Sequence, residues 1–328
     1  MTTVKKATLN DICSPIQDEL KSFSQRLEKE LSSQDELIRG IHAHLLKMTG
    51  KFLRPMLAIL CSRVENKKPE QIIPLAVSIE LIHTATLVHD DIIDDSSFRR
   101  NQPSVYSKWG REISIVSGDY LYAKAFLLLA SFQDQRISQA FASCAHVMCE
   151  GEMKQIEKRN NFLMKEEEYL KIIHQKTAAL FQAACIGGAY FSGTGLENIE
   201  KLGRYGYGLG MAFQIVDDCL DIVGETETMG KTAGLDVYRN EVTLPLLYLF
   251  SDLAPGERQV LLSEIQHGEE AVRDRIRLLA VEKKAVSRAM QKAREYAEKS
   301  LEELSGVSDS LYKESLICLP DYCLERVK

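Results

Sequence analysis

Apolar residues along the chain recur at three- and four-residue spacing, which is the period of an α-helix. One such run contains Tyr120, Ala123 and Leu127, and a second covers residues 169–180. Convincing runs of alternating polar and apolar β-branched residues, which would indicate strands, are scarce. The pattern therefore predicts an all-α protein.

The positions of proline and of polar segments indicate how the helices are organised. No proline stands between Pro103 and Pro245. Because proline breaks a helix interior, this interval can hold several long helices. The polar linkers are short, and the longest one, residues 224–242, is a candidate lid over a site. No boundary between domains is apparent, so we expect one helical domain over residues 1–328.

Composition narrows the class of protein. The 328 residues are 45% hydrophobic and 27% charged, with a net charge of −6, which is ordinary for a soluble globular protein. No block of lysine and arginine favours nucleic acid as a partner. Residues 1–10 lack the apolar run of a signal peptide, and no stretch looks long and apolar enough to span a bilayer. The eight cysteines form no Cys-x-x-Cys pair, so we expect reduced thiols in the cytoplasm.

Two clusters of three aspartates stand out because each lies within an otherwise apolar segment. Their spacing is identical: Asp90-Asp91-x-x-Asp94 and Asp217-Asp218-x-x-Asp221. On a helix the first and last members of each cluster lie one turn apart on one face, where like charges repel each other. A solvated face usually mixes lysine with the acids, and neither cluster contains a cation. A bound cation would remove the repulsion, so the clusters predict metal sites.

The residue type indicates which metal to expect. Magnesium prefers oxygen ligands and typically takes one or two protein carboxylates together with substrate phosphate. Two such faces opposed across a helical bundle would hold magnesium ions that bridge a diphosphate. The clusters therefore predict a magnesium-dependent enzyme that acts on a diphosphate.

A diphosphate also needs cations from the protein, and four short segments offer them. Arginine binds phosphate oxygens through two N–H groups, whereas lysine acts as a point charge. For any one of these side chains a surface salt bridge is the simpler interpretation. Together with the aspartates, the set predicts two diphosphate subsites. The segments are Lys51-Phe52-Leu53-Arg54, Arg99-Arg100, Lys176-Thr177 and Gly230-Lys231.

These motifs resemble the trans-isoprenyl diphosphate synthases, and in particular the long-chain polyprenyl members of that family. The resemblance covers roughly residues 50–245, with the motifs in the family's order and at its separations. The matching segments include Gly50–Pro55, Glu80–Asp91, Gly151-Glu152-x-x-Gln155, Lys176-Thr177-Ala178 and Phe213-Gln214-x-x-Asp217-Asp218.

The resemblance implies a fold and a reaction. The fold would be a single-domain bundle of long, mostly antiparallel helices around a central catalytic cavity, as in isoprenoid synthases. The reaction would condense isopentenyl diphosphate head-to-tail with farnesyl or geranylgeranyl diphosphate and give a long all-trans polyprenyl diphosphate. A homodimer is the family's usual assembly, and release of the product could involve transient contact with a membrane.

The resemblance also assigns roles to residues. Asp90 and Asp94 would hold two magnesium ions and Asp217 would hold a third, with Asp91, Asp218 and Asp221 in support. The allylic diphosphate would be bound by Arg99, Lys176, Thr177, Gln214 and Lys231. Isopentenyl diphosphate would be bound by Lys51, Arg54, His83 and Arg100. Magnesium and these cations would neutralise the departing pyrophosphate, and pyrophosphate itself would take the proton that is lost.

Three positions depart from the family pattern. Glu241 stands where a phosphate-binding lysine is expected, and Arg239 is the nearest residue that could supply the missing charge. Asn101 replaces a glycine after the arginine pair, and Tyr106 replaces a common histidine. These departures bear on how strongly the allylic diphosphate is bound, and they leave the reaction class unchanged.

The residues just before the first cluster bear on product length. Ala85 and Thr86 are small, whereas relatives with short products have aromatic rings at these positions. A growing chain could therefore pass them and continue along the helix by Ile82. One helical turn rises about 5.4 Å, close to one isoprene unit. We expect a product longer than geranylgeranyl, of about six to eight units.

Other functions remain open at this point. A geranylgeranyl or farnesyl diphosphate synthase would share the motifs and make a shorter product. A class I terpene cyclase shares one aspartate cluster but does not need the cations of a second diphosphate subsite. A subunit of a heteromeric synthase would fit the substitution at Glu241. A purely structural helical protein would have no use for either aspartate cluster.

Overall fold

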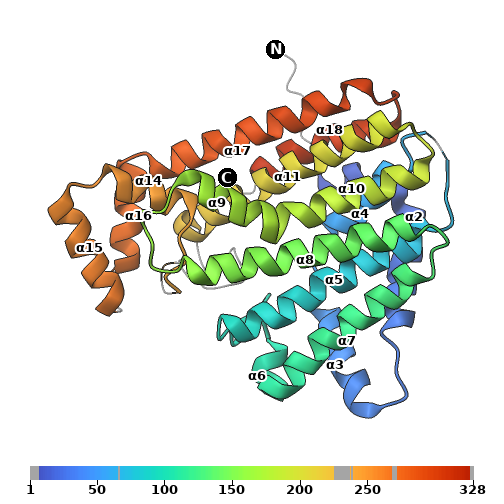
Figure 1. The fold of residues 1–328 in the computed structure, drawn as a ribbon, viewed down its shortest axis with the longest axis horizontal. Coiled ribbons are helices and arrows are strands. Elements are labelled where there is room, and N and C mark those ends of the chain that lie inside the picture. The colour runs from blue at the N-terminus through green and yellow to red at the C-terminus, as the bar shows by residue number, and fades with distance from the viewer. Residues whose placement is uncertain (1–6, 66, 225–236, 238, 268–271, 326–328) are drawn as a thin grey trace. The chain divides into compact units, whose positions relative to one another are not determined.

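Helices account for most of the protein (Figure 1). The computed structural model describes residues 7–65, 67–224, 237, 239–267 and 272–325. Within these residues the all-α prediction is confirmed, and the only strands are a two-residue pair. The candidate lid at residues 224–242 lies mostly outside the described part of the chain, and so does Lys231.

The chain divides into two compact units. Unit 1 comprises Met1–Ala145, Leu180–Gly206 and Glu303–Leu319, and unit 2 comprises His146–Ala179, Tyr207–Glu302 and Pro320–Lys328. The long helices expected between Pro103 and Pro245 are present: α7 (Arg111–Ala130), α8 (Gln135–Glu157) and α11 (Leu196–Val223).

Unit 1 holds the first aspartate cluster. Its further elements are α1 (Leu9–Cys13), η1 (Ser14–Ile16), α2 (Gln17–Glu30), α3 (Glu36–Lys47), α4 (Leu53–Ser62), α5 (Ile72–Ile93), β1 (Phe98–Arg99), β2 (Gln102–Pro103), α6 (Val105–Trp109), most of α10 (Ala179–Ser192), η3 (Glu303–Gly306) and most of α18 (Leu311–Leu324).

Helix α5 is the core of unit 1. Pro74 lies in its first turn, where proline is tolerated. From Leu75 to Ile82 every residue is buried, as expected for a helix that is apolar on all sides.

Helices α5 and α7 lie side by side in unit 1 (Figure 1). The contact is close because α7 has Gly118 where a Cβ atom would overlap the ring of His89 on α5. The imidazole Nε2 of His89 lies 3.0 Å from the backbone oxygen of Ile115. Glycine at this position therefore lets α7 approach the end of α5 that carries the aspartates.

Two helices meet the length and composition of a membrane span, contrary to the expectation from sequence. They are α5, with mean hydropathy 1.5, and α7, with mean hydropathy 1.4. In α5, 61% of the apolar window is buried in the protein, which is the usual state of a core helix. In α7 only 28% is buried, and Val116 and Leu127 are 63% and 73% exposed.

A short hairpin follows the first aspartate cluster, in the segment that carries Arg99 and Arg100. Phe98 pairs with Pro103 and Arg99 with Gln102 in antiparallel register. The two residues of the turn, Arg100 and Asn101, have φ angles of 51° and 60°. Two successive left-handed residues give the turn type that matches the twist of a hairpin. Asparagine tolerates this conformation, which explains how Asn101 replaces a glycine.

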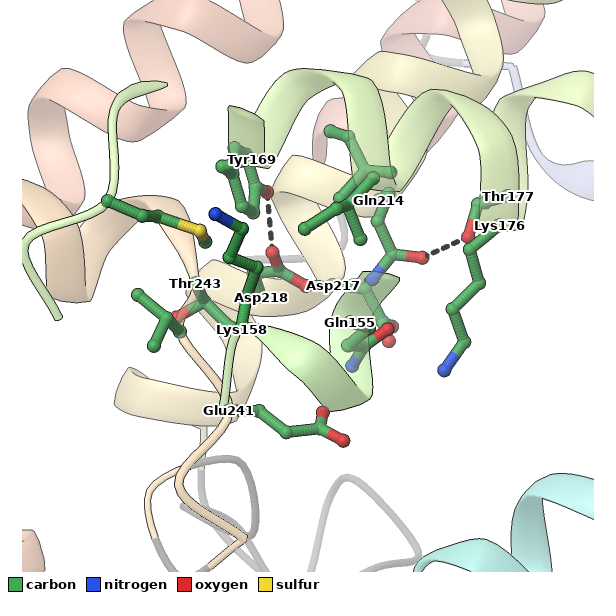
Figure 2. A pocket seen from close by; sticks show the side chains of 14 residues that line it. Gln155, Lys158, Tyr169, Lys176, Thr177, Gln214, Asp217, Asp218, Glu241 and Thr243 are labelled. Carbon is green, nitrogen blue, oxygen red and sulfur yellow. Dashed lines mark hydrogen bonds between the residues drawn. The ribbon is translucent and has the colours of Figure 1, made fainter. Parts of the chain in front are cut away.

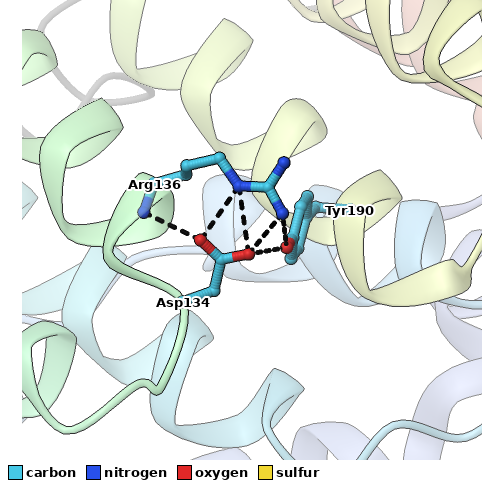
Figure 3. A network of polar contacts seen from close by, with 3 residues as sticks. All are labelled: Asp134, Arg136 and Tyr190. Atoms are coloured by element: carbon cyan, nitrogen blue, oxygen red, sulfur yellow. Dashed lines mark hydrogen bonds and ion pairs between the residues drawn. The ribbon is translucent and has the colours of Figure 1, made fainter.

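A polar network on unit 1 joins α10 to the start of α8 (Figure 3). The Asp134 carboxylate accepts hydrogen bonds from the Arg136 guanidinium and from the Tyr190 hydroxyl. Hydrogen bonds from Arg136 lower the pKa of Asp134. Arg136 is exposed, and Asp134 and Tyr190 are half-buried, so water screens the ion pair and it contributes little to stability. We interpret the network as an anchor between two helices.

Unit 2 holds the second aspartate cluster, on α11. Its further elements are α9 (Glu166–Ile173), the π-helical turn η2 (His174–Ala178), α14 (Leu244–Asp252), α15 (Pro255–His267), α16 (Val272–Glu282) and α17 (Ala285–Glu302). Small residues bring α17 close to α11. The buried residues of α17 include Ala289, Ala293 and Ala297. On α11, a Cβ atom on Gly208 would lie 2.9 Å from the backbone oxygen of Tyr296. This packing fixes the helix that carries Asp217.

Candidate functional site

The first aspartate cluster lies at the C-terminal end of α5. Asp90 and Asp94 are half-buried, and Asp94 is the cap residue of the helix. The middle residue, Asp91, is only 2% exposed. Its carboxylate accepts hydrogen bonds from Arg99 at 2.8 Å and 2.7 Å. The C-terminal end of a helix carries partial negative charge, so two accessible carboxylates at this point favour a bound cation.

The predicted isopentenyl diphosphate residues gather in unit 1. Arg54, in the first turn of α4, has its guanidinium 4.5 Å from the centre of the Phe181 ring. Its Nη1 donates to Nε2 of His83 at 3.2 Å. Burial, and then the charges of Arg54 and Arg100, lower the pKa of His83 well below its usual range. His83 is therefore a neutral imidazole that accepts a hydrogen bond. Lys51 is exposed.

Glu80 belongs to the same group of side chains, although it was not predicted as a site residue. It lies one turn before His83 on α5 and is 7% exposed. Burial raises its pKa to about 7, although the charges of Arg54 and Arg100 act in the opposite direction. The sequence did offer a signal for Glu80, namely a carboxyl group on an otherwise apolar helix. Such a group is buried only where hydrogen-bonding or charged partners lie next to it. Glu80 is thus an acid held among the cations of the predicted subsite.

Unit 2 contains a cavity of about 110 Å³ that includes Asp217 (Figure 2). It has room for a few water molecules or one phosphate-sized group. Predicted residues from two elements line it: Lys176 and Thr177 from η2, and Gln214, Asp217 and Asp218 from α11. Others in its wall were not predicted: Gln155, Lys158, Met164, Tyr169, Ile172, Ile173, Glu241, Val242 and Thr243.

A chain of hydrogen bonds runs through this pocket (Figure 2). The Thr177 hydroxyl donates to Oε1 of Gln214 at 2.8 Å, and the Gln214 amide donates to Asp218 at 2.7 Å. The Tyr169 hydroxyl donates to the other Asp218 oxygen at 2.5 Å. Burial raises the pKa of Asp218 to about 7. Asp218 is therefore a buried anchor for polar side chains, and Tyr169 is a site residue that periodicity had assigned only to a helix face.

Lys176 lies in a π-helical turn and not in regular α-helix as the sequence suggested. Gly151 of α8 makes room for this turn, because a Cβ atom on residue 151 would lie 2.7 Å from the backbone nitrogen of Lys176. The Lys176 ammonium forms an ion pair with Glu152 at 2.6 Å. Such turns are frequent at functional sites, and this one directs Lys176 and Thr177 into the pocket.

Glu241, the residue that departs from the family pattern, has a partner. Its carboxylate lies 3.2 Å from the Arg159 guanidinium, and the residue is 8% exposed. The preceding residue, Asn240, has a φ of 56°, and its backbone oxygen accepts a hydrogen bond from the Asn160 nitrogen at 2.9 Å. The charge next to Glu241 thus includes Arg159, which the sequence did not suggest.

The donor set suits divalent cations. Asp90, Asp94 and Asp217 are half-buried, so their carboxylates can reach a ligand, whereas Asp221 is 1% exposed. Across the described ranges no three acidic, histidine or cysteine side chains gather into a metal cage. Accessible carboxylates of this kind suit magnesium, which typically binds one or two of them together with substrate phosphate. The fit is therefore to ions that bind together with a diphosphate.

The predicted chain-length residues lie on α5, in the two turns before the first aspartate cluster. Ala85 and Ile82 are buried, at 0% and 1% exposure. Thr86 is half-buried, and its hydroxyl donates to the His83 backbone oxygen at 2.7 Å. Of the three, Thr86 is the residue with the accessible side chain.

The family model described as polyprenyl synthetase matches residues 35–281. The octaprenyl diphosphate synthase of Haemophilus influenzae is 32% identical over 97% of both chains. Heptaprenyl diphosphate synthase component 2 of Geobacillus stearothermophilus is 37% identical over 74% of this chain and 76% of that protein. The short chain isoprenyl diphosphate synthase of Methanothermobacter thermautotrophicus is 33% identical over 95% of this chain and 98% of that protein.

Solved structures agree with the sequence relatives. The polyprenyl synthase of Caulobacter crescentus, complexed with calcium and isoprenyl diphosphate, has a TM-score of 0.94 and 32% identity over 99% of both chains. The chain belongs to the polyprenyl synthetase family. Its relatives are polyprenyl diphosphate synthases, which are prenyltransferases, so the resemblance seen in the sequence and the isoprenoid-synthase fold are both confirmed.

Proposed function

We propose that this protein condenses isopentenyl diphosphate head-to-tail with farnesyl or geranylgeranyl diphosphate and makes a long all-trans polyprenyl diphosphate. The observation that carries the proposal is the pocket of unit 2, where Asp217 shares one cavity with Lys176, Thr177 and Gln214. A carboxylate that suits a metal ion and polar groups that suit a diphosphate line the same space. The name of the Haemophilus influenzae relative, an octaprenyl diphosphate synthase, supports the long product.

The reaction depends on a divalent metal, and we propose about three magnesium ions. Asp90 and Asp94 would hold two of them and Asp217 would hold the third. When bound, the ions supply positive charge that stabilises the departing pyrophosphate. The calcium in the Caulobacter crescentus complex supports a divalent site in that relative.

The chain's own residues would then divide the work. Lys176, Thr177, Gln214, Arg99 and Lys231 bind the allylic diphosphate, and the cations among them stabilise the charge that grows as the C–O bond breaks. The isopentenyl double bond attacks the allylic cation and forms the new C–C bond. A proton leaves the product, and the released pyrophosphate takes it.

The second diphosphate would bind in unit 1. Arg54 and Arg100 offer guanidinium groups to its oxygens, and Lys51 adds an exposed point charge. Neutral His83, which already accepts from Arg54, orients that guanidinium. We also propose that residues 1–328 act as one catalytic domain, since the family match over residues 35–281 takes in segments of both units.

We propose a homodimer as the working assembly. Helix α7 carries Ile115, Val116 and Leu127, which are 44%, 63% and 73% exposed, and an apolar helix face of this kind suits a second copy. We place the protein in the cytoplasm, with transient membrane contact when the long product leaves. The five cysteines that are buried, among eight free thiols in the structure, agree with a reducing compartment.

One assay tests the proposal: the purified chain with magnesium, labelled isopentenyl diphosphate, and farnesyl or geranylgeranyl diphosphate. We expect products of about six to eight isoprene units by mass spectrometry, and none when magnesium is chelated. Elongation of farnesyl diphosphate that stops at geranylgeranyl would indicate a shorter-chain synthase, and the Methanothermobacter relative is named a short chain isoprenyl diphosphate synthase.

Two other outcomes would identify the remaining alternatives. Conversion of the allylic substrate without isopentenyl diphosphate would indicate a class I terpene cyclase. No turnover by the chain alone, with turnover restored by a second protein, would indicate a heteromeric synthase, which the name of the Geobacillus relative, a component, also suggests for that protein.

A further inference from the structure

Three ion pairs lie at the pocket of unit 2, and one of them has the opposite orientation to the other two. Lys158 and Lys176 line the pocket, and their acidic partners do not. In the third pair the acid, Glu241, lines the pocket and the cation, Arg159, does not. The three pairs are Lys158–Glu168 at 2.6 Å, Lys176–Glu152 at 2.6 Å and Arg159–Glu241 at 3.2 Å.

The fold holds this third pair in place. The Glu241 side chain is 10% exposed and the Arg159 side chain 23%. The hydrogen bond from Asn160 to the Asn240 backbone oxygen fixes the segment to the linker after α8. The next two residues, Val242 and Thr243, also line the pocket. In Figure 2 the Glu241 carboxylate and the Lys176 ammonium extend toward the same region.

The orientation of the pair decides its effect on an anion. The charges of Arg159 and Glu241 cancel at long range, but a group in the pocket lies nearer to the carboxylate. Charges interact more strongly when little water separates them. The pair therefore repels a diphosphate in the pocket, whereas the lysine expected from the family pattern would attract it.

We propose that the Arg159–Glu241 pair weakens the hold of this pocket on pyrophosphate and so speeds its release between successive condensations. The inference rests on the proposed function, because a long-chain synthase must clear pyrophosphate from its allylic subsite after every addition. The affinity of the subsite is then a compromise between holding the allylic substrate and freeing the leaving group.

The test is the affinity for pyrophosphate with magnesium, measured by calorimetry on the full chain. Glu241→Gln should tighten binding about three- to thirtyfold, the range for one charge at a partly screened site. Arg159→Gln should weaken it by a similar factor. The double variant should return to within about threefold of the wild type, because it removes both charges. Inhibition of turnover by pyrophosphate should follow the same order.

A matched control uses the acid of a normally oriented pair. Glu168→Gln removes a carboxylate that does not line the pocket and whose side chain is 40% exposed, against 23% for Arg159, so water screens it and pyrophosphate affinity should change less than about twofold. If Arg159→Gln fails to fold, Arg159→Lys keeps the charge and should keep the wild-type affinity. Thermal unfolding of each variant without ligand separates loss of fold from loss of affinity.

Two results would overturn the inference. If both single variants weaken pyrophosphate binding, the Arg159–Glu241 pair serves only to hold residues 240–243 in position. If Glu241→Gln weakens binding and raises the magnesium requirement, the carboxylate supports an ion. A wild-type chain that binds magnesium pyrophosphate but makes no polyprenyl product would contradict the proposed function; the variants would then still measure the effect of the pair on pyrophosphate affinity, but not a role between condensations.

Discussion

The two aspartate clusters have the same spacing in sequence and different surroundings in the structure. At the end of α5 the outer two aspartates are half-buried and the middle one is buried. In α11 only Asp217 is half-buried, and Asp218 and Asp221 are 5% and 1% exposed. The first cluster therefore presents two accessible carboxylates and the second presents one, which is the ratio of ions that we propose for them.

The partners of the buried aspartates differ as well. Asp91 accepts from the cationic Arg99, whereas Asp218 accepts from the neutral groups of Tyr169 and Gln214. A cationic partner stabilises an ionised carboxylate more than a neutral donor does. The comparison shows that the middle aspartate of the same motif can have a cationic partner in one place and neutral partners in another, according to which side chains the fold packs against it.

The largest expected effect tests the accessible carboxylates. Asp90→Ala and Asp217→Ala should each lower kcat about a thousandfold, because each removes a metal ligand that stabilises the transition state. Magnesium titrations of the residual activity should show a loss of apparent metal affinity. Asp95→Ala is the matched control, since the carboxylate of this exposed aspartate accepts a hydrogen bond from the Tyr106 hydroxyl and is not a proposed metal ligand, and its kcat should stay within about twofold. Equal activity of all three variants would contradict a metal role.

The next effect concerns buried carboxyls, which both regions contain. The pKa of Glu80 in unit 1 is raised to about 7 by burial, so the folded protein holds a proton that the unfolded chain has lost. Stability should therefore fall as pH rises from about 4.5 to about 7, by up to about 1.4 kcal/mol per pH unit. Glu80→Gln should reduce the slope by this amount and leave the part that Asp218 contributes, because burial also raises the pKa of Asp218 to about 7; urea unfolding at pH 5, 6 and 7 measures the slope. An unchanged slope would show that Glu80 keeps its ordinary pKa.

A pair of tyrosines tests the difference in burial between the clusters. Tyr169 donates to buried Asp218 at 2.5 Å, and Tyr106 donates to exposed Asp95 at 2.7 Å. Tyr169→Phe leaves a buried acceptor with one donor fewer, which costs about 1–3 kcal/mol of unfolding free energy. Tyr106→Phe should cost less than about 0.5 kcal/mol, because water replaces the lost bond. Equal losses would show that the second cluster is no more buried than the first.

The smallest effect on turnover, and the clearest on product, concerns the residues four before each cluster. They are Thr86 on α5 and Phe213 on α11. Thr86→Phe should shorten the product while kcat changes only a few-fold, because the ring would block the path of the chain. Phe213→Ala should leave product length unchanged, since we propose that the chain runs along α5. Mass spectrometry of the products distinguishes the two variants.

A companion variant separates blocking from misfolding. Ala85 has no exposed surface, so Ala85→Phe should also shorten the product but lower stability by about 1–3 kcal/mol through overpacking. Thr86→Phe should lower stability less, since Thr86 is only half-buried. Long products from both variants would contradict a path along α5.

The sequence by itself determined the class of fold and the chemistry of the site. Helical periodicity and the proline-free interval predicted long helices, because both are properties of neighbouring residues. The spacing of Asp90, Asp94 and Asp217 predicted divalent metal sites for the same reason. Family motifs then added the reaction, and the comparisons confirmed it.

Tertiary structure decided which of these groups are accessible, charged or paired. Arg159 lies 82 positions before its partner Glu241, and Tyr169 lies 49 positions before Asp218. Neither pair leaves a periodic trace in the sequence, because contacts of this range depend on how helices pack. Burial likewise comes from the surrounding core, and it alone raises the pKa of Glu80 against two arginines. These residues could be read from the sequence, but their burial and their partners depend on the folded protein.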